Sequence, residues 1–488
     1  MTKINIARAN GEDLGIPLQY LNRHGFITGA TGTGKTVTLK VISEQLSKQG
    51  IPVFLADIKG DLASLAQPAT AGSQTERCAN LGITDYTERS FPVRLWDVFG
   101  VNGHPVRATI AEMGPLLLAR LFELTDTQTD VLQVLFKIAD DKGYLLIDLK
   151  DLQALISEVT NHMDDYVGPY GHMTKQTLGA IQRHLLTIQE QGGDLFFGEP
   201  AIKLTDFIRQ DEKGQGVLNV LMAQKLFENP LLYATMLIWL LAQLFEELPE
   251  VGDQDKPKML FFFDEAHLLF NDMPKGLVNQ VEKVVRLIRS KGVGVFFVTQ
   301  NPIDLPENIL AQLGNRIQHA LRAYTPKEQK AIKAAAESYR ENENFKVAEV
   351  ITELKVGEAL ISFLDEEGIP SVVERAMVRP PESFMGTVDP AYIQQLISTS
   401  PFDAQYREPV DRESAYELLS AKLDAENEEK AKAELQKQLE KEAKEKEKAK
   451  KRQPKGTVEK IADSFTSNLI RSIGREMSRS VLGIFKRR

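Results

Sequence analysis

The chain has little cysteine and no long hydrophobic segment. Its only cysteine among 488 residues is Cys78, so an intrachain disulfide is excluded and a reducing cytoplasm is the expected compartment. The first residues, MTKINIARANGEDLG, lack the apolar core of a signal peptide. The longest apolar stretch, residues 231–245, is shorter than the roughly 20 residues of a membrane span. We therefore expect that stretch to form a buried helix.

The chain also lacks an excess of positive charge. Its formal net charge is −9, which argues against a surface that binds nucleic acid over most of its area. A net sum hides local patches, so it does not exclude a basic channel inside a ring of subunits. Hydrophobic residues make up 42% and charged residues 26%, as in ordinary globular proteins, and the length predicts one large domain with appendages.

Short apolar runs alternate with helical patterns, which favours an α/β fold with a mainly parallel sheet. We predict strands at residues 25–28, 51–56, 216–222, 258–263, 294–299 and 317–322, and a closing hairpin from GEALISFL and VVERAMVR. Helices are predicted at residues 36–48, 278–289 and 309–313. From residue 105 to 190, apolar residues recur at spacings of three and four, which predicts an α-helical insertion.

These patterns divide the chain into five parts. The predicted parts are the first half of the α/β core (residues 1–104), an α-helical insertion (105–215), the second half of the core (216–385), a charged helical linker (386–454) and an amphipathic basic C-terminal helix (455–488). From residue 413 onward the linker is dominated by Ala, Glu and Lys, at spacings that suit ion pairs on a solvated helix. Its leucines are too few to predict a coiled coil.

The predicted C-terminal helix carries an apolar stripe flanked by Lys and Arg. The stripe consists of Val458, Ile461, Phe465, Leu469, Ile473, Met477, Val481 and Phe485. Such a stripe predicts either peripheral contact with an anionic membrane surface or binding to a protein partner. Gly474 and Gly483 weaken an isolated helix, which favours the partner-binding interpretation.

Residues 29–36, GATGTGKT, match the phosphate-binding pattern G-x-x-x-x-G-K-[ST] between a predicted strand and a predicted helix. Glycines let backbone N–H groups curl around phosphate oxygens, and the helix N-terminus adds its positive dipole end. Lys35 supplies a charge for the β- and γ-phosphates, and the Thr36 hydroxyl is a ligand for Mg²⁺. The predicted ATP-binding residues are Gly29, Ala30, Thr31, Gly32, Thr33, Gly34, Lys35, Thr36 and Val37.

The apolar strand in MLFFFDEAHLLF ends in two acids, Asp264 and Glu265. In open α/β sheets, ligands bind beyond the carboxyl ends of the strands. We therefore predict that Asp264 holds the Mg²⁺ shell and that Glu265 polarises the attacking water as general base. The letters DEAH also occur in DEAH-box helicases, but the QRxGRxGR motif of those proteins does not occur in this sequence. His267 is expected to pack or to support the site.

Polar residues after the other strands are further candidates. Gln300, after the strand in GVFFVTQNP, is predicted to contact the γ-phosphate or the attacking water. An arginine that neutralises transition-state charge is expected at Arg316 or Arg322, just beyond that strand. Asp57, in ADIKGDL, either faces the site or serves the turn before Gly60, and both interpretations stay open.

The order GATGTGKT, ADIKGDL, helical insertion, FFFDEAHLLF, VTQNP and LGNRI resembles the HerA branch of the HerA/FtsK ATPases, most closely bacterial proteins with a HerA-like helicase C-terminal domain. The resemblance covers residues 16–380 and implies a RecA-like P-loop fold, a homo-hexameric ring, ATP and Mg²⁺ as cofactors, and helicase or translocase movement along DNA. It assigns Lys35, Asp264, Glu265 and Gln300 the roles given above. It also implies that Arg316 or Arg322 completes a neighbouring subunit's site.

Archaeal members of that family carry an N-terminal β-barrel that helps assemble the ring and dock a nuclease. Here GATGTGKT begins at Gly29, which we expect to leave no room for such a barrel. A nuclease or other protein partner therefore remains an open expectation.

Three functions compete at this point. The leading hypothesis is an oligomeric ATPase that translocates DNA, with pore loops supplied by the helical insertion. The second is an ATPase motor or switch that acts on proteins or at a membrane surface, as secretion ATPases of the same superfamily do. The third is a binding module without catalysis, which the intact Lys35, Asp264 and Glu265 speak against.

Overall fold

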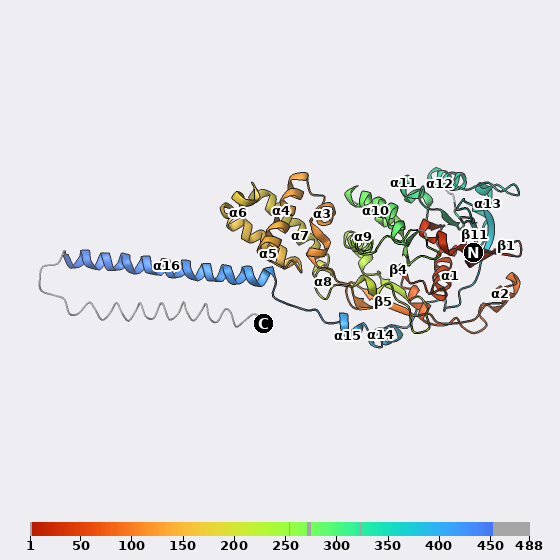
Figure 1. Ribbon diagram of the computed structural model, residues 1–488, viewed down its shortest axis with the longest axis horizontal. Helices are drawn as coiled ribbons and strands as arrows, with labels where there is room; N and C mark the ends of the chain where they lie inside the picture. The colour runs from red at the N-terminus through yellow and green to blue at the C-terminus, as the bar shows by residue number, and fades with distance from the viewer. Residues whose placement is uncertain (1, 253, 271–274, 323–324, 452–488) are drawn as a thin grey trace. The chain divides into compact units, whose positions relative to one another are not determined.

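The computed structural model describes residues 2–252, 254–270, 275–322 and 325–451 (Figure 1). Contacts divide the chain into a compact unit, Met1–Leu419, and a second unit, Ser420–Arg488. The first unit holds the whole described sheet, whereas the described part of the second unit continues a single helix.

The first unit is built on one sheet, which has twelve strands in the described part of the chain, in the order β2-β1-β12-β11-β10-β3-β9-β8-β4-β7-β5-β6. The strands are β1 (Lys3–Ala9), β2 (Glu12–Pro17), β3 (Gly25–Thr28), β4 (Val53–Asp57), β5 (Val93–Asp97), β6 (His104–Pro105), β7 (Leu218–Met222), β8 (Met259–Phe263), β9 (Val293–Thr299), β10 (Asn315–Gln318), β11 (Glu358–Ser362) and β12 (Glu374–Val378). All neighbours from β10 to β6 are parallel, whereas β11, β12, β1 and β2 pair antiparallel. The prediction of a mainly parallel sheet is confirmed.

Both faces of the central strands are buried, which explains their continuous apolar runs. In β8, Phe261 and Phe263 belong to the core on one face, and Leu260 and Phe262 belong to the core on the other. Successive side chains of a strand point to opposite faces, so one short strand supplies both cores. The first core also includes helices α9 and α10 and the helical insertion, and the second includes α1 and α14.

The α-helices of the described residues lie between and after these strands along the chain. They are α1 (Lys35–Lys48), α2 (Thr75–Leu81), α3 (Ile110–Leu121), α4 (Asp126–Lys142), α5 (Leu149–Asn161), α6 (Met163–Tyr170), α7 (Lys175–Glu190), α8 (Gly193–Phe196), α9 (Pro230–Glu247), α10 (Lys275–Ile288), α11 (Glu307–Leu310), α12 (Pro326–Glu337), α13 (Val347–Glu353), α14 (Pro390–Ser398), α15 (Asp403–Tyr406) and α16 (Ala415–Lys451). Short 3₁₀ turns at Leu62–Ala66 (η2) and Ala266–Leu269 (η5) follow β4 and β8.

The helical insertion corresponds to α3–α8, which gather into a helical group in Figure 1. Capping boxes at Thr109, Thr125 and Asp148 begin α3, α4 and α5, because each side chain accepts a hydrogen bond from the first helical turn. Helix α9 contains the long apolar stretch and packs in the core, as predicted. None of the described helices is both long and apolar enough to cross a bilayer.

The structure differs from the predicted elements at several boundaries. The strand predicted at residues 317–322 is β10, which ends at Gln318 because the backbone beyond it turns to bond the phosphate loop. The hairpin of β1 and β2 was not among the predicted strands. Residues 390–406, inside the predicted linker, form α14 and α15 within the first unit. The five-part division of the chain stays a prediction.

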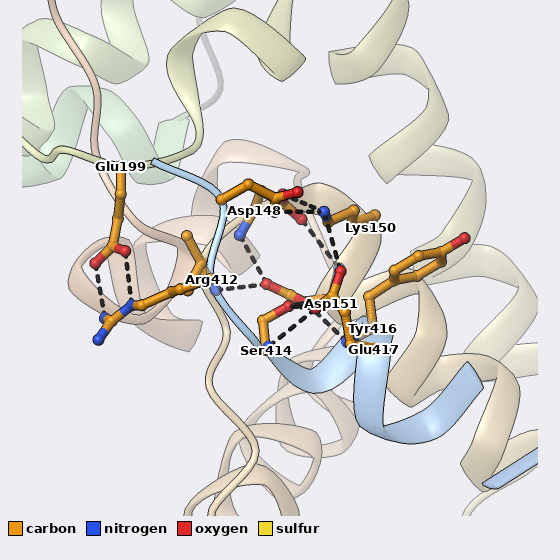
Figure 2. Close-up of polar contacts among 10 residues, drawn as sticks. Asp148, Lys150, Asp151, Glu199, Arg412, Ser414, Tyr416 and Glu417 are labelled. Atoms are coloured by element: carbon orange, nitrogen blue, oxygen red, sulfur yellow. Dashed lines mark hydrogen bonds and ion pairs between the residues drawn. The ribbon is translucent and has the colours of Figure 1, made fainter. Parts of the chain in front are cut away.

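A buried carboxylate ties the start of α16 to the insertion (Figure 2). Asp151, in α5, is fully buried, and its Oδ2 accepts hydrogen bonds from the backbone N–H groups of Ile147 and Asp148 at 2.8 and 3.1 Å. Its Oδ1 accepts from the Ser414 hydroxyl at 2.5 Å and from the Tyr416 N–H at 2.9 Å. One side chain therefore holds two segments that are far apart in the sequence.

Ion pairs flank this junction, and Figure 2 shows them around Asp151. The Lys150 ammonium lies 3.2 Å from Asp411 and 3.3 Å from Glu417. Arg412 bonds both carboxylate oxygens of Glu199 at 2.7 Å. These pairs are more exposed than Asp151, so we expect each to contribute less to stability.

In the second unit, α16 is a charged helix, as its composition predicts. Pairs spaced by four residues join Lys422 to Glu426 and Glu428 to Lys432. Leu423, Leu435 and Leu439 are exposed along it. The apolar stripe predicted from residue 458 to 485 lies outside the described residues.

Candidate functional site

The predicted phosphate loop joins β3 to α1 and is held by backbone hydrogen bonds. The Ala30 N–H donates to the Ala320 carbonyl at 2.8 Å, and the Gly357 N–H donates to the Thr33 carbonyl at 3.0 Å. Gly34, at the start of α1, has a φ of 119°, a conformation that favours glycine. The segment after β10 and the turn before β11 therefore brace the loop.

Lys35 and Thr36 form the first turn of α1, directly after the loop. The Lys35 side chain is buried, and its Nζ donates to the carbonyls of Gly29 at 2.7 Å and Ala30 at 3.2 Å. Thr36 and Val37 are half-buried. The helix N-terminus and the lysine ammonium thus lie at the same end of the loop, as anion binding requires.

The two predicted acids lie directly after β8 and are both buried. Oδ1 of Asp264 accepts from the N–H of Glu265 at 3.0 Å, and the Tyr233 hydroxyl donates to the Asp264 carbonyl at 3.3 Å. Glu265 has a φ of 47° and a ψ of 50°, a left-handed conformation that is uncommon for a non-glycine residue. The backbone therefore fixes the direction in which the Glu265 side chain leaves the strand.

The charges of Asp264, Glu265 and Lys59 affect the pKa of Lys35, and those of Lys59 and Glu265 affect the pKa of Asp264. Burial, opposed by Lys59 and assisted by Glu265, raises the pKa of Asp264 to about 6. Burial and the charge of Lys59 lower the pKa of Lys35, and the carboxylates of Glu265 and Asp264 act against that shift. The phosphate loop and the end of β8 are therefore electrostatically coupled.

Three side chains surround the Glu265 carboxylate. Lys59 places its Nζ 3.2 Å from Oε1. Gln300, at the end of β9, donates a long hydrogen bond of 3.5 Å from Nε2 to Oε2, and His267 Nδ1 also lies 3.5 Å from Oε2. The structure thus brings the predicted Gln300 and Glu265 together across neighbouring strands.

The two candidate arginines bond to other parts of their own chain. The Arg316 guanidinium is half-buried and donates to the carbonyls of Leu313 at 3.1 Å and Leu310 at 3.5 Å, and also to the Ser338 carbonyl. Arg322 is exposed and donates to the Thr352 carbonyl at 2.6 Å. Their role at a neighbouring site stays a prediction.

Two residues near the site escaped the sequence analysis, Lys59 and His319. His319 is buried, and its Nε2 lies 2.8 Å from the Thr38 hydroxyl while its Nδ1 lies 2.9 Å from the Glu358 carbonyl. Burial lowers the pKa of His319 to about 4, so the ring is neutral at physiological pH. Nδ1 must then donate to the carbonyl and Nε2 must accept from Thr38, which ties α1 to β11.

Asp57 serves the turn after β4. Its carboxylate accepts from the N–H groups of Gly60 at 2.7 Å and Leu62 at 2.9 Å. Burial raises the pKa of Asp57 to about 7, with further contributions from Asp61 and Asp264. Asp57 therefore orders the loop that carries Lys59, which supports the turn interpretation of the sequence.

The donor set fits Mg²⁺. This ion takes few protein ligands and completes its octahedral shell with water and phosphate oxygens. The Thr36 hydroxyl and the Asp264 carboxylate are oxygen ligands of the required kind. The described residues contain no cluster of three or more His, Cys, Asp or Glu side chains able to hold a metal by themselves.

Comparisons with known proteins identify the family and similar proteins. The family model described as "Helicase HerA-like C-terminal" matches residues 2–488. The DNA double-strand break repair helicase HerA of Sulfolobus acidocaldarius is 22% identical over 355 residues, which cover 71% of this chain and 63% of that protein. HerA of Saccharolobus solfataricus is 22% identical over 372 residues, which cover 74% of this chain and 66% of that protein. The chain thus spans less than two thirds of the length of these relatives.

A solved structure shows a similar fold. The plasmid coupling protein TrwB, in complex with a non-hydrolysable GTP analogue, matches with a TM-score of 0.50 and 13% identity, over 80% of this chain and 92% of TrwB. The likeness confirms the predicted RecA-like P-loop sheet.

Proposed function

The chain belongs to the HerA-like helicase C-terminal family, and from that premise we propose that it is a Mg²⁺-dependent ATPase motor that moves along double-stranded DNA. The observation that carries the ATPase proposal is the convergence of the Lys35 loop, the Asp264–Glu265 pair and Gln300 at one edge of the sheet. Phosphoryl transfer needs positioned charges and a positioned water more than covalent chemistry, and this site is built from such groups.

Each residue has a defined task in the proposed reaction. The backbone N–H groups of the phosphate loop and the Lys35 ammonium bind the phosphates of ATP. Thr36 and Asp264 would hold Mg²⁺, which would supply positive charge to neutralise the phosphates of ATP. Glu265 accepts the proton of the attacking water, and Gln300, bonded to Glu265 Oε2, orients the water or the γ-phosphate.

The DNA and ring parts of the proposal rest on family membership. The similar proteins are named as DNA double-strand break repair helicases. In a ring, Arg322 or Arg316 would reach the site of a neighbouring subunit and neutralise transition-state charge. Arg322 is exposed and would have to break one bond, to the Thr352 carbonyl, whereas the half-buried Arg316 would have to break its bonds to the carbonyls of Leu313, Leu310 and Ser338. Exposure therefore favours Arg322 for that task.

The test compares steady-state ATP hydrolysis by the full chain with and without double-stranded DNA, at low and moderate salt. Glu265→Gln removes the proposed base, and Glu250→Gln, at an exposed glutamate, is the matched control. DNA contacts through phosphates weaken as salt rises. We expect DNA to stimulate hydrolysis, moderate salt to reduce the stimulation, and only Glu265→Gln to abolish turnover.

Other outcomes have distinct meanings. Hydrolysis that depends on Glu265 but ignores DNA would retain the ATPase proposal and reject DNA as the moved polymer, in favour of a protein or membrane-surface partner. Hydrolysis that survives Glu265→Gln unchanged would reject the assignment of the base.

A further inference from the structure

Lys59 lies on a short loop whose shape is fixed from within. The loop follows β4 and leads into η2, and the Asp57 carboxylate bonds the N–H groups of Gly60 and Leu62. Gly60 has a φ of 79°, in the left-handed region that other residues avoid. The loop is therefore ordered by a buried carboxylate and a glycine turn, which gives the Lys59 side chain a defined starting point.

From that loop, Lys59 reaches the carboxylate of Glu265, which lies just beyond the end of β8, the strand next to β4. Its Nζ lies 3.2 Å from Oε1, and the side chain is 39% exposed whereas that of Glu265 is 10% exposed. Burial acts against the charge, yet the carboxylates of Asp264 and Glu265 raise the pKa of Lys59 overall. The ammonium is thus held charged beside the acid.

The two oxygens of Glu265 have different partners. Oε1 contacts the Lys59 ammonium, whereas Oε2 is approached by Gln300 and His267 at 3.5 Å each. A short ion pair restrains a carboxylate more than a long neutral hydrogen bond does. With Oε1 engaged and the Glu265 backbone held in its left-handed conformation, Oε2 is the oxygen left for proton transfer.

We propose that Lys59 is a positioning residue for hydrolysis: it holds Oε1 of Glu265 so that Oε2 points at the attacking water beside Gln300. The inference rests on the proposed ATPase function and adds a residue to its site. Lys59 itself takes no proton and forms no bond to the substrate. Its contribution is to orientation, and a displacement of about 1 Å in a reacting group can cost about 100-fold in rate.

The experiment measures kcat and KM for ATP with Lys59→Met, which keeps the chain length and removes the charge, and with Lys59→Arg, which keeps the charge. Lys48→Met is the matched control, because it breaks another lysine–glutamate pair, with Glu382, at the far end of α1. We expect Lys59→Met to lower kcat about 10- to 100-fold with KM unchanged, and Lys59→Arg to recover much of the loss. Lys48→Met should leave both constants unchanged.

A double-mutant cycle separates positioning from general damage. If Lys59 acts through Glu265, adding Lys59→Met to Glu265→Gln should lower the residual single-turnover rate no further. An additive loss, an unchanged kcat, an increased kcat, or a rise in KM alone would each overturn the inference. Should Lys59→Met fail to fold, Lys59→Gln is judged by the same criteria.

Nucleotide binding distinguishes this failure from failure of the proposed function. Binding of a fluorescent ATP analogue with Mg²⁺ is measured for wild type and every variant. If wild type neither binds nor hydrolyses ATP, the proposed function is wrong and the inference falls with it. If wild type does both and the Lys59 variants match it, only the inference is wrong.

Discussion

Replacement of Asp151 by Ala is expected to destabilise the first unit, because this carboxylate is fully buried and accepts four hydrogen bonds. Alanine would leave the N–H groups of Ile147, Asp148 and Tyr416 without that acceptor. An unsatisfied buried donor costs about 1–3 kcal/mol, so the three together predict a loss of roughly 3–6 kcal/mol after partial relaxation.

Asp411→Ala is the matched control at the same junction. The Asp411 side chain is 82% exposed and contacts Lys150 at 3.2 Å, so its loss should cost about 0–1 kcal/mol. Thermal unfolding followed by circular dichroism should show a clear drop in Tm for Asp151→Ala and almost none for Asp411→Ala. Limited proteolysis should also cut the segment around Ser414 faster in Asp151→Ala. Equal Tm values for the two variants would refute the assignment of Asp151 as the anchor.

Two further predictions concern the site. Because burial raises the pKa of Asp264 to about 6 from its usual 3.8, the free enzyme loses its Mg²⁺ ligand as pH falls through that value, and kcat/KM should drop about tenfold between pH 7 and pH 5. A higher Mg²⁺ concentration should move this decline in kcat/KM to lower pH, since the metal competes with the proton. A decline centred near pH 4 that does not depend on the Mg²⁺ concentration would contradict the assignment. His319→Ala removes the link from Thr38 to the Glu358 carbonyl, so Tm should fall and KM for ATP should rise. Thermal unfolding and steady-state kinetics measure these two values. If both values are unchanged, the link does not brace the phosphate loop.

The parts of the site that were predictable from sequence are those encoded locally. GATGTGKT carries its own turn, lysine and helix start, and the apolar run before Asp264 places the acids at a strand end. Gln300 followed from the same rule, that polar residues after parallel strands meet at one edge of the sheet. The structure brings Gln300 to Glu265 from the neighbouring strand, although the two lie far apart in the sequence.

What could not be predicted depends on strand order. Lys59 reaches Glu265 because β4 lies next to β8, and His319 reaches Thr38 because β10 lies next to β3. The periodicity of a single sequence identifies strands but not their neighbours. The strand predicted to run to residue 322 ended at Gln318 for a related reason: the Ala320 carbonyl bonds the phosphate loop, a contact between distant segments.

The most direct test of the central claim is a comparison of Mg²⁺-dependent ATP binding and hydrolysis by wild type and Glu265→Gln. Radiolabelled ATP is incubated with each protein, and bound nucleotide and released ADP are measured from the same sample. The account predicts that wild type converts ATP to ADP, whereas Glu265→Gln binds ATP comparably and retains it unhydrolysed. Equal turnover by the two proteins, or no ATP binding by either, would contradict it.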